Sequence, residues 1–429
     1  MDRIILKPRR EESLLRYHPW VFSGAIAQIV GHPAEGDLVS VCSADGQLLA
    51  CGHYQIGSIA VRVLSFDEDP TRPDFYLRML TRAFKLREAC GLTSSADTTC
   101  YRLVHGEGDS LPGLIIDYYD GVCVLQAHSV GMFRAKSVIA VALQELYGSS
   151  LKAVYDKSSG TAPFKAGLDL VDGYLWKAPG FSDADPSCHP EAIPSCHPEA
   201  SPSCHPEAEG RRISPDERVV LENGNKFLVN WVEGQKTGFF LDQRDNRFRV
   251  GALAAGRRVL NLFCYTGGFS IYALAGGAAH VDSVDSSQRA MDMVDRNVAL
   301  NGFDAALHTS YCTDAIDFVK AAPEGAYDLI IVDPPAFAKH RGALKNALRA
   351  YQRLNAAAIA KVAPGGFVFT FSCSQVVDKE AFALAVFSAA AETGRSVRIL
   401  DRLNQGADHS VNIYHPEGEY LKGLLLYVE

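Results

Sequence analysis

The chain has 429 residues, of which 47% are hydrophobic, and it carries a formal net charge of −8 at pH 7. This length suffices for two or three domains with cores of their own, while the acidic balance excludes a general attraction to nucleic acid, so that any RNA contact must come from a local basic patch. No run of eighteen apolar residues occurs, and the charged start MDRIILKPRREE lacks the apolar region of a secretory signal. These features favour a cytoplasmic protein without a membrane span.

Residues 1–72 are predicted to form a small β domain. Short alternating runs at 37–41 and 59–64 are separated by glycine and proline turns, which is typical of a small barrel. The first sixteen residues hold five basic side chains against three acids, and the motif HPWVF follows at 18–22. The basic residues are Arg3, Lys7, Arg9, Arg10 and Arg16. The segment is either an RNA-contacting edge or a solvated arm beside a core tryptophan, and composition alone favours the arm.

Residues 73–181 are predicted to form a small α+β domain. Helical spacing occurs at 74–92 and 133–146, and strand-like runs occur within 101–126 and at 152–156. One turn carries His105, Glu107 and Asp109, which could indicate a catalytic or metal cluster. Polar residues are equally typical of turns, so we predict no metal site here.

Residues 182–212 interrupt the pattern with three copies of PSCHPEA at an eight-residue period. Each copy places a cysteine directly before a histidine, at Cys188, Cys196 and Cys204, but adjacent ligands fit poorly into one tetrahedral zinc site. Proline-rich units without large apolar side chains cannot form a core, which predicts a disordered insertion in a surface loop. The chain has eleven cysteines, an odd number scattered along its length, and this favours reduced thiols over a disulfide framework.

Residues 213–429 alternate between strand and helix patterns. A strand is predicted at 227–232, and an apolar run at 259–263 stops at Tyr-Thr-Gly-Gly before a helical segment at 269–274. A second strand ends at Asp285. Further strands are predicted at 306–311, 327–332, 365–371, 397–400 and 423–428, with helices at 287–300 and 379–393. Seven strands with interleaved helices predict a doubly wound α/β sheet.

The residues that could carry chemistry all follow strands, where sheets of this kind bind their ligands. Gly267 and Gly268 would let a ligand approach the backbone, and Asp285, eighteen residues past Gly267, is placed for ribose hydroxyls. Asp314, Asp333 and Cys373 follow later strands. The pattern indicates a nucleoside-cofactor site, although a plain packing turn is the alternative because the full G-x-G-x-x-G is absent.

These motifs resemble those of class I S-adenosylmethionine-dependent methyltransferases. The wider series HPWVFSGAI, RLVHGEGDSLPGL, GQKTGFFLDQR, NLFCYTGGF, DPPAF, FSCSQ and EGEYLKGLLL resembles, in that order, the bacterial 23S ribosomal RNA cytosine-5 methyltransferase family. The resemblance covers nearly the whole chain except 182–212. It implies an N-terminal PUA domain, a central α+β domain and a Rossmann-like, seven-stranded catalytic domain. It also implies S-adenosyl-L-methionine as cofactor and 23S ribosomal RNA as partner, and it allows a homodimer.

The resemblance implies roles for single residues. It places Asp285 on the ribose, Asp314 near the adenine amino group and Asp333 at both the cofactor and the target base. Asp242 would lie close to the cofactor, and the other residues implied there are Phe263, Tyr265, Gly267, Phe269, Ser286, Gln243 and Arg244. Those implied to bind substrate are Pro334, Pro335, Phe337, Lys339 and Arg341. The chain departs from the pattern twice, with Val376 where a histidine is expected and Ala336 where related enzymes carry a second cysteine.

Cytosine methylation at carbon 5 requires a nucleophile because that carbon is itself a poor one. A thiolate that adds to carbon 6 makes carbon 5 enamine-like, which requires an ionisable cysteine beside the base. Cys373 follows the apolar run GGFVFTF and is the predicted nucleophile, with Asp333 as its catalytic partner. A buried inert cysteine is the alternative, and Cys264 and Cys312 are rivals by position. The base that releases the adduct is not identified.

One segment offers a local source of RNA contacts. No acid occurs from Ala336 to Arg353, and four basic residues step by four along a predicted helix, namely Arg341, Lys345, Arg349 and Arg353. This basic stripe suits either phosphate contacts or a solvated helix face. Two other functions stay open, namely a methyltransferase acting on guanine nitrogen or another substrate with a structural Cys373, and a non-catalytic RNA-binding protein.

Overall fold

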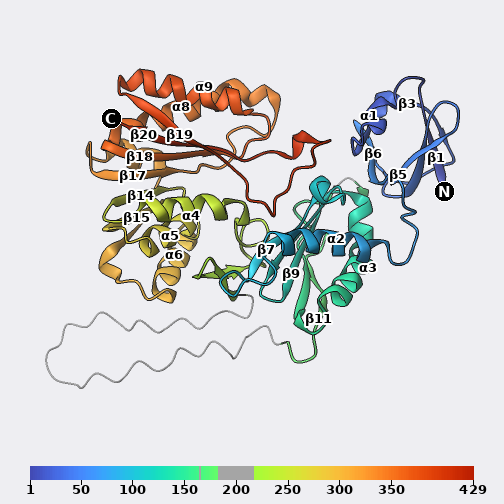
Figure 1. Cartoon of the computed structure of the whole chain (residues 1–429), viewed down its shortest axis with the longest axis horizontal. Coiled ribbons are helices and arrows are strands. Elements are labelled where there is room, and N and C mark those ends of the chain that lie inside the picture. Colours follow the sequence, from blue (N-terminus) through green and yellow to red (C-terminus); the bar gives the residue numbers. More distant parts are fainter. Residues whose placement is uncertain (164–165, 182–216) are drawn as a thin grey trace.

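The computed structural model describes residues 1–163, 166–181 and 217–429. The PSCHPEA repeats, and with them the predicted insertion at 182–212, lie outside these residues. Within the described residues the strands form a six-stranded, a five-stranded and a seven-stranded sheet and a two-stranded hairpin. Figure 1 shows the N-terminal sheet at one end of the molecule, the central sheet in the middle and the C-terminal sheet at the other end. The predicted α/β class is confirmed, whereas the predicted boundaries between the domains stay predictions.

The N-terminal domain is a six-stranded sheet of order β2-β6-β5-β4-β1-β3. Its elements are β1 (Asp2–Leu6), α1 (Glu12–Leu15), β2 (Trp20–Phe22), β3 (Ile26–Val30), β4 (Leu38–Cys42), β5 (Leu48–Tyr54) and β6 (Ile59–Ser65). Alternation of apolar side chains along β1 and β4 places Ile4, Val39 and Val41 in one fully buried core. The domain matches the small β module predicted for this region.

The central domain is a five-stranded sheet of order β11-β10-β9-β8-β7 with two helices packed against it. Its elements are α2 (Phe75–Ala89), β7 (Cys100–His105), β8 (Leu114–Tyr119), β9 (Val122–Ala127), α3 (Val130–Tyr147), β10 (Ala153–Asp156) and β11 (Gly173–Lys177). Ser129 begins α3 because its side chain accepts a hydrogen bond from the Met132 amide.

A hairpin of β12 (Glu217–Glu222) and β13 (Asn225–Asn230) connects the central and C-terminal domains. On the central side, the Thr99 amide donates to the Leu221 carbonyl at 2.9 Å. On the C-terminal side, the Leu228 amide donates to the Asn297 side chain at 2.8 Å. The sequence pattern predicted β13 but not β12.

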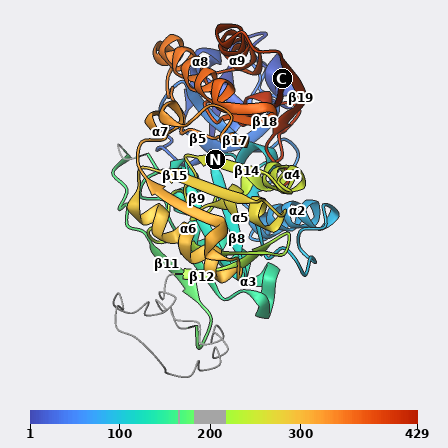
Figure 2. The same cartoon turned by 90° about the vertical axis from the view of Figure 1, so that its left-hand side faces the viewer.

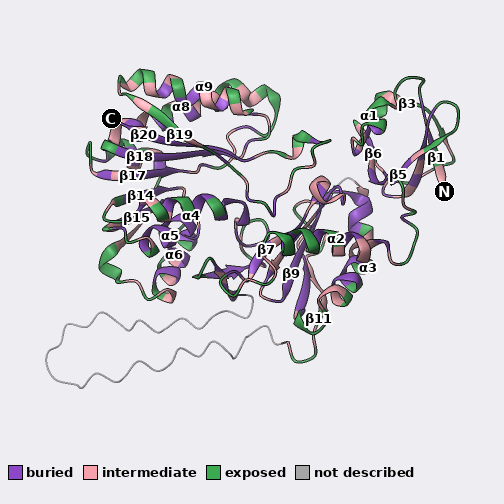
Figure 3. Cartoon of the chain, viewed as in Figure 1, coloured by how far each residue is buried: buried purple, intermediate pink, exposed green. Residues whose placement is uncertain are grey.

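The C-terminal domain is a seven-stranded sheet of order β16-β15-β14-β17-β18-β20-β19, in which β20 runs antiparallel to both neighbours. Its strands are β14 (Arg258–Leu262), β15 (His280–Asp285), β16 (His308–Cys312), β17 (Tyr327–Val332), β18 (Val362–Ser372), β19 (Val397–Asn404) and β20 (Lys422–Val428). The chain order reverses between β14 and β17, so this switch point is the expected position of a ligand. Figure 3 shows the inner strands β14 and β17 of this sheet as largely buried.

Helices cover both faces of the C-terminal sheet, as Figures 1 and 2 show. On one face lie α4 (Arg244–Leu253), α5 (Gly268–Ala275) and α6 (Gln288–Leu300). On the other face lie α7 (Ala315–Ala321), α8 (Leu344–Lys361) and α9 (Lys379–Thr393). Because strands buried on both faces read as continuous apolar runs, 327–332 and 365–371 were recognisable as strands from sequence. In the part of the chain that the structure describes, no helix is long and apolar enough to cross a membrane.

The connection from β19 to β20 reaches the other two domains. Asp408 accepts hydrogen bonds from the Arg244 side chain and from the Arg102 amide, both at 3.0 Å, and so links α4 to β7. Further along the same connection, the His415 ring lies 4.3 Å from that of Trp20 in the N-terminal domain. Trp20 also donates from its indole nitrogen to Glu107 at 2.8 Å. The HPWVF motif therefore contributes its tryptophan to a junction of the three domains.

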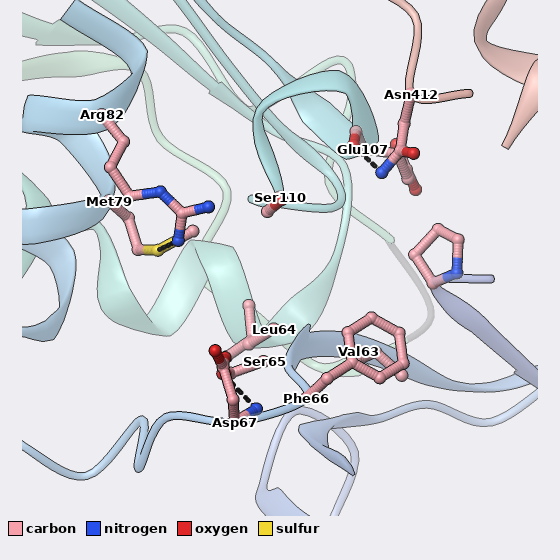
Figure 4. A pocket seen from close by; sticks show the side chains of 11 residues that line it. Val63, Leu64, Ser65, Phe66, Asp67, Met79, Arg82, Glu107, Ser110 and Asn412 are labelled. Carbon is pink, nitrogen blue, oxygen red and sulfur yellow. Dashed lines mark hydrogen bonds between the residues drawn. The ribbon is translucent and has the colours of Figure 1, made fainter. Parts of the chain in front are cut away.

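A cavity of about 90 Å³ lies at this junction, as Figure 4 shows. Phe66, Met79 and Asn412 line it, one from each domain. Its volume holds only a few water molecules, and its lining includes none of Gly267, Asp285, Asp333 and Cys373. It is therefore a packing gap between domains rather than a substrate site.

Candidate active site

The turn after β14 has a strained backbone that Asp285 fixes. Phe263 and Tyr265 adopt left-handed conformations with φ of 58° and 49°, which non-glycine residues adopt rarely and which often occur at functional sites. The Asp285 carboxylate accepts hydrogen bonds from the Tyr265 amide at 3.1 Å and from the Ser287 amide at 3.0 Å. Gly267 has φ of 80°, and a Cβ there would lie 3.0 Å from Val294. The turn therefore requires glycine at this position.

The other residues implied near the cofactor follow β14, β15 and β16. Phe269 is buried on α5 and stacks on Phe371 of β18 at 5.6 Å. Ser286 is exposed directly after β15. Asp314 is also exposed, and one of its oxygens accepts hydrogen bonds from the Ile316 and Asp317 amides. Asp314 therefore begins α7, a structural role that leaves its second oxygen available to a ligand.

The polar groups around this turn fit a cofactor that contains a nucleoside. The buried side-chain oxygens without a hydrogen-bond partner include Thr266 Oγ1 in the glycine turn, Asp242 Oδ1 on the segment before α4 and Asn261 Oδ1 on β14. Unpartnered buried oxygens are unfavourable in a protein without a ligand. Together with the glycine turn and Asp285, they provide acceptors and open backbone for such a molecule.

Asp333 follows β17 and lies beside a second carboxylate. The Gln243 side-chain amide, in the turn Leu241–Gln243, donates to Asp333 at 3.1 Å. Burial and the nearby charge of Asp242 raise the pKa of Asp333 to about 7, although the Gln243 bond opposes the rise. Asp242 in turn accepts a hydrogen bond from the Tyr420 hydroxyl at 2.6 Å. Asp333 is therefore a carboxyl group that can hold a proton near neutral pH.

Cys373 follows β18, the strand that pairs with β17. Its side chain is half-buried, and burial together with the charges of Asp333 and Asp242 raises the pKa of its thiol to about 11. The buried cation Lys422 lowers it in part. In the absence of a ligand the group is therefore a thiol, and a proton must leave it before it can act as a nucleophile.

The rival cysteines occupy other environments. Cys264 is buried, and burial holds the pKa of its thiol well above the usual range. Cys312 is exposed at the end of β16 and pairs with Asp285 across the sheet. Four strand spacings separate β16 from β18, or about 19 Å at the usual spacing. Cys373 is thus the cysteine that lies next to Asp333.

Arg244, which the resemblance implies lies near the cofactor, is held in the structure by other residues of the protein. Its guanidinium is buried and donates to Asp408 at 3.0 Å and to the Cys100 carbonyl at 2.9 Å, and it lies 3.5 Å from Glu222. These partners hold it in the contact between the central and C-terminal domains. Its neighbour Gln243, which contacts Asp333, points to the site instead.

The residues after Asp333 form a loop joined to the Cys373 turn. Ser374 Oγ donates to the Ala338 carbonyl at 3.1 Å and accepts from the Ala338 amide at 3.3 Å. Pro334 is buried, Pro335 is exposed, and Phe337 is partly buried with its ring 4.8 Å from that of Tyr351. The loop is thereby fixed beside Cys373.

The basic stripe is exposed along its whole length, but it is not one helix. Lys345, Arg349 and Arg353 lie on α8, which begins at Leu344. Arg341 instead belongs to a 3-10 turn, Arg341–Ala343, which directly precedes α8. Lys339 is exposed just before this turn. The predicted helix therefore starts later than the four-residue spacing indicated.

The polar turn at 105–109 forms contacts within the central domain and, through Glu107, with the N-terminal domain. Asp109 forms a bidentate ion pair with the buried Arg87, and Glu107 accepts from Trp20 and, at 2.7 Å, from Arg62. His105 lies 3.3 Å from the Arg102 side chain. The His105 amide also donates to the Asp109 carboxylate at 2.6 Å, a hydrogen bond within the turn itself.

The strand order with its single antiparallel strand, the glycine turn after β14 and the acid after β15 define a class I S-adenosylmethionine-dependent methyltransferase with a small N-terminal β domain. A family model described as S-adenosylmethionine-dependent methyltransferase matches residues 209–414, and a PUA-like domain model matches residues 4–66. Both findings confirm the predicted fold class and cofactor.

The chain is also similar to curated proteins along its full length. It is 38% identical over 425 residues to Ribosomal RNA large subunit methyltransferase I of Erwinia tasmaniensis, covering 98% of each chain. It is 39% identical over 428 residues to the protein of that name from Aeromonas salmonicida, covering 99% of this chain and 98% of the relative. The chain belongs to this family. A solved Streptococcus mutans protein, assigned as S-adenosylmethionine-dependent, shares the fold with a TM-score of 0.78 at 22% identity over both full chains.

Proposed function

We propose that the protein methylates carbon 5 of a cytosine in 23S ribosomal RNA through a covalent adduct of Cys373. The relatives named for the large ribosomal subunit support the substrate class. The observation that carries the proposal is the placement of Cys373 and Asp333 after two paired strands, one a thiol and the other a carboxyl group with a pKa of about 7. Covalent addition to a pyrimidine needs a nucleophile and a proton donor together.

The cofactor is proposed to lie over the ends of β14, β15 and β16. Bound S-adenosylmethionine would supply a sulfonium methyl group and leave as S-adenosylhomocysteine. Asp285 would accept the ribose hydroxyls, Asp314 would face the adenine amino group, and Gln243 would orient Asp333 beside the methyl group. The remaining proposed contacts are Phe263, Tyr265, Gly267, Phe269 and Ser286.

The chain's own residues would activate the base once the Cys373 thiol has given its proton to water. The Cys373 thiolate forms a bond to carbon 6, the carbon 5–carbon 6 π electrons shift through the ring, and Asp333 gives its proton to ring nitrogen 3. Carbon 5 thereby becomes enamine-like and can form a bond to the methyl group. Loss of the proton on carbon 5 to a base or water reforms the carbon 5–carbon 6 double bond and expels the Cys373 thiolate. The proton on ring nitrogen 3 then returns to Asp333, which leaves neutral 5-methylcytosine and the free enzyme.

The RNA is proposed to approach over α8 and the loop after Asp333. Lys339, Arg341, Lys345, Arg349 and Arg353 form an exposed basic edge that suits phosphate contacts. Pro334, Pro335 and Phe337 would shape the pocket for the target base, which must leave its stack to reach Cys373. A cytoplasmic location follows from this substrate as a prediction, and the homodimer also stays a prediction.

Mass spectrometry of ribosomal RNA nucleosides tests this function directly. Cells that lack the gene should lose a 5-methylcytosine from their 23S RNA, and the same cells carrying the gene should regain it. If 5-methylcytosine is unchanged while another methylated nucleoside disappears, the assignment to carbon 5 is wrong.

One observation favours a second function. A half-buried thiol with a raised pKa is what a structural cysteine would show, and methylation of an exocyclic or ring nitrogen needs no covalent thiol. In that case the protein would methylate guanine nitrogen or another substrate. Full activity of Cys373→Ala would support it, whereas loss of activity with intact cofactor binding would support the covalent route.

A further inference from the structure

We propose that Lys422 is a positioning residue for Cys373, which fixes the turn that carries the thiol and supplies the positive charge that stabilises the thiolate. The inference rests on the proposed role of Cys373 as the nucleophile, and it adds a residue to which the sequence pattern assigned no role.

Lys422 lies directly beneath the Cys373 turn. It is the first residue of β20, and it pairs antiparallel with Ser372, the last residue of β18. Only 6% of Lys422 is exposed. Lys422 is thus a buried lysine at the carboxyl end of the sheet, and its partner on β18 is the residue that directly precedes Cys373.

The ammonium group of Lys422 bridges the segment from Ser374 to Val377, which directly follows Cys373. Its nitrogen donates to the Ser374 carbonyl and to the Val377 carbonyl, each at 2.6 Å. Two short charge-assisted hydrogen bonds to carbonyls three residues apart restrict the backbone around Cys373. The turn is closed further by the Val377 amide, which donates to the Ser374 carbonyl at 3.2 Å.

The ammonium group of Lys422 forms no ion pair with a carboxylate among the described residues. The charges of Asp378 and Glu419 act on it, but Asp378 caps α9 through the Ala381 amide at 2.7 Å, and Glu419 pairs with Lys379. Burying a cation against carbonyls alone is unfavourable relative to an apolar side chain. A thiolate on Cys373 would supply the missing negative charge.

The charges around Cys373 show why such a cation matters. Asp333 and Asp242 face the thiol and disfavour its ionised form, as does burial, whereas Lys422 is the cation that favours it. Burial lowers the pKa of Lys422 to about 8, so the ammonium form is present at neutral pH and is lost above it. Removing this cation should therefore leave the thiolate exposed to a low dielectric, to the charge of Asp242 and, in the fraction of molecules in which Asp333 is ionised, to the charge of Asp333 as well.

Alkylation of Cys373 measures this effect without RNA or methyl transfer. The full chain would be treated with iodoacetamide between pH 6 and 10, and the peptide that contains Cys373 would be quantified by mass spectrometry, with the exposed Cys312 as internal reference. Lys422→Arg keeps the charge and the donors, Lys422→Gln keeps donors without charge, and Lys422→Met removes both.

We expect alkylation of Cys373 at pH 7 to be at least tenfold slower in Lys422→Gln and Lys422→Met than in the wild type. In both variants the increase of the alkylation rate with pH should occur at higher pH than in the wild type. Lys422→Arg should stay within threefold, and Cys312 should be unchanged in every variant. If Lys422→Met does not fold, Lys422→Gln decides. Wild-type alkylation of Cys373 in a folded Lys422→Gln protein would overturn the proposal.

The readout separates this inference from the proposed function. If the alkylation profile moves as expected but the wild-type enzyme forms no adduct with RNA, Lys422 still tunes the thiol and the covalent mechanism falls. If the adduct forms in the wild type while the charge of Lys422 has no effect on alkylation, the mechanism stands and the role of Lys422 falls.

Discussion

Gln243 donates its side-chain amide to the Asp333 carboxylate at 3.1 Å and so joins the turn before α4 to the end of β17. The contact places Asp333 beside Asp242, whose charge, after burial, contributes to raising the pKa of Asp333 to about 7. Asp333 is therefore present in both protonation states near neutral pH, and this property leads to a measurable pH dependence of stability.

Asp333→Asn should weaken the dependence of stability on pH. The pKa of Asp333 is raised in the folded state, so the folded protein holds a proton between about pH 4 and pH 7 that the unfolded chain releases. The free energy of unfolding should therefore fall as pH rises through this window. Between pH 5 and pH 8 the wild type should lose about 2–3 kcal/mol more than the variant in urea unfolding. Equal losses in both proteins would show that Asp333 titrates normally.

Asp285→Ala should weaken cofactor binding by about 1.5–3 kcal/mol, because the ribose hydroxyls lose a charged acceptor. The carboxylate also fixes the Tyr265 amide, so the strained turn should loosen as well. Isothermal calorimetry with S-adenosylmethionine would measure the loss, with the exposed Glu324→Ala as matched control. An affinity equal to that of the control would remove Asp285 from the site.

Arg244→Met should destabilise the fold by about 3–5 kcal/mol, because it leaves Asp408 buried without its main cationic partner. Adding Asp408→Asn should recover part of this loss. Cofactor affinity, measured by calorimetry at a temperature at which the variant is folded, should stay within threefold. A tenfold weaker affinity with unchanged melting temperature would instead support the direct cofactor contact that the resemblance implied.

Charge reversal on α8 should weaken RNA binding. Lys345→Glu together with Arg349→Glu removes two cations from the basic stripe, which should lower affinity for a 23S fragment at least tenfold and reduce the salt dependence of binding. Lys226→Glu, exposed on the β13 hairpin, is the matched control. If all three proteins bind equally at low salt in a filter or fluorescence assay, the stripe is a solvated helix face.

Much of the C-terminal fold could be predicted from sequence because its central strands are buried on both faces and read as apolar runs that end in polar residues. The ends of β14, β15, β17 and β18 therefore identified Gly267, Asp285, Asp333 and Cys373. The N-terminal and central domains followed from local alternation and helical spacing. Helix starts were less certain, as Arg341 shows, because a 3-10 turn and an α-helix share nearly the same spacing.

The parts that could not be predicted depend on contacts between distant segments. Nothing local shows that Arg244 pairs with Asp408, 164 residues away, or that Tyr420 bonds to Asp242, 178 residues away. A signal for Lys422 was present, since it is a charged residue at the start of the otherwise apolar run GLLLYV. Its meaning required the register of β20 against β18, which places it under Cys373.

The central claim is that Cys373 forms a covalent bond to carbon 6 of cytosine. RNA containing 5-fluorocytosine tests it most directly, because fluorine cannot leave carbon 5 as a proton does and the methylated adduct cannot release the thiol. We predict a protein–RNA band that resists denaturant and requires S-adenosylmethionine. Cys373→Ala and Cys373→Ser should both abolish this band while retaining cofactor affinity, since a serine hydroxyl is far less nucleophilic than a thiolate.

Two results of the same measurement would contradict the account. A band that persists in Cys373→Ala but vanishes in Cys264→Ala or Cys312→Ala would keep the mechanism and move the nucleophile. If an RNA that the wild-type enzyme demonstrably methylates gives no band after 5-fluorocytosine replaces its cytosines, the covalent mechanism is wrong.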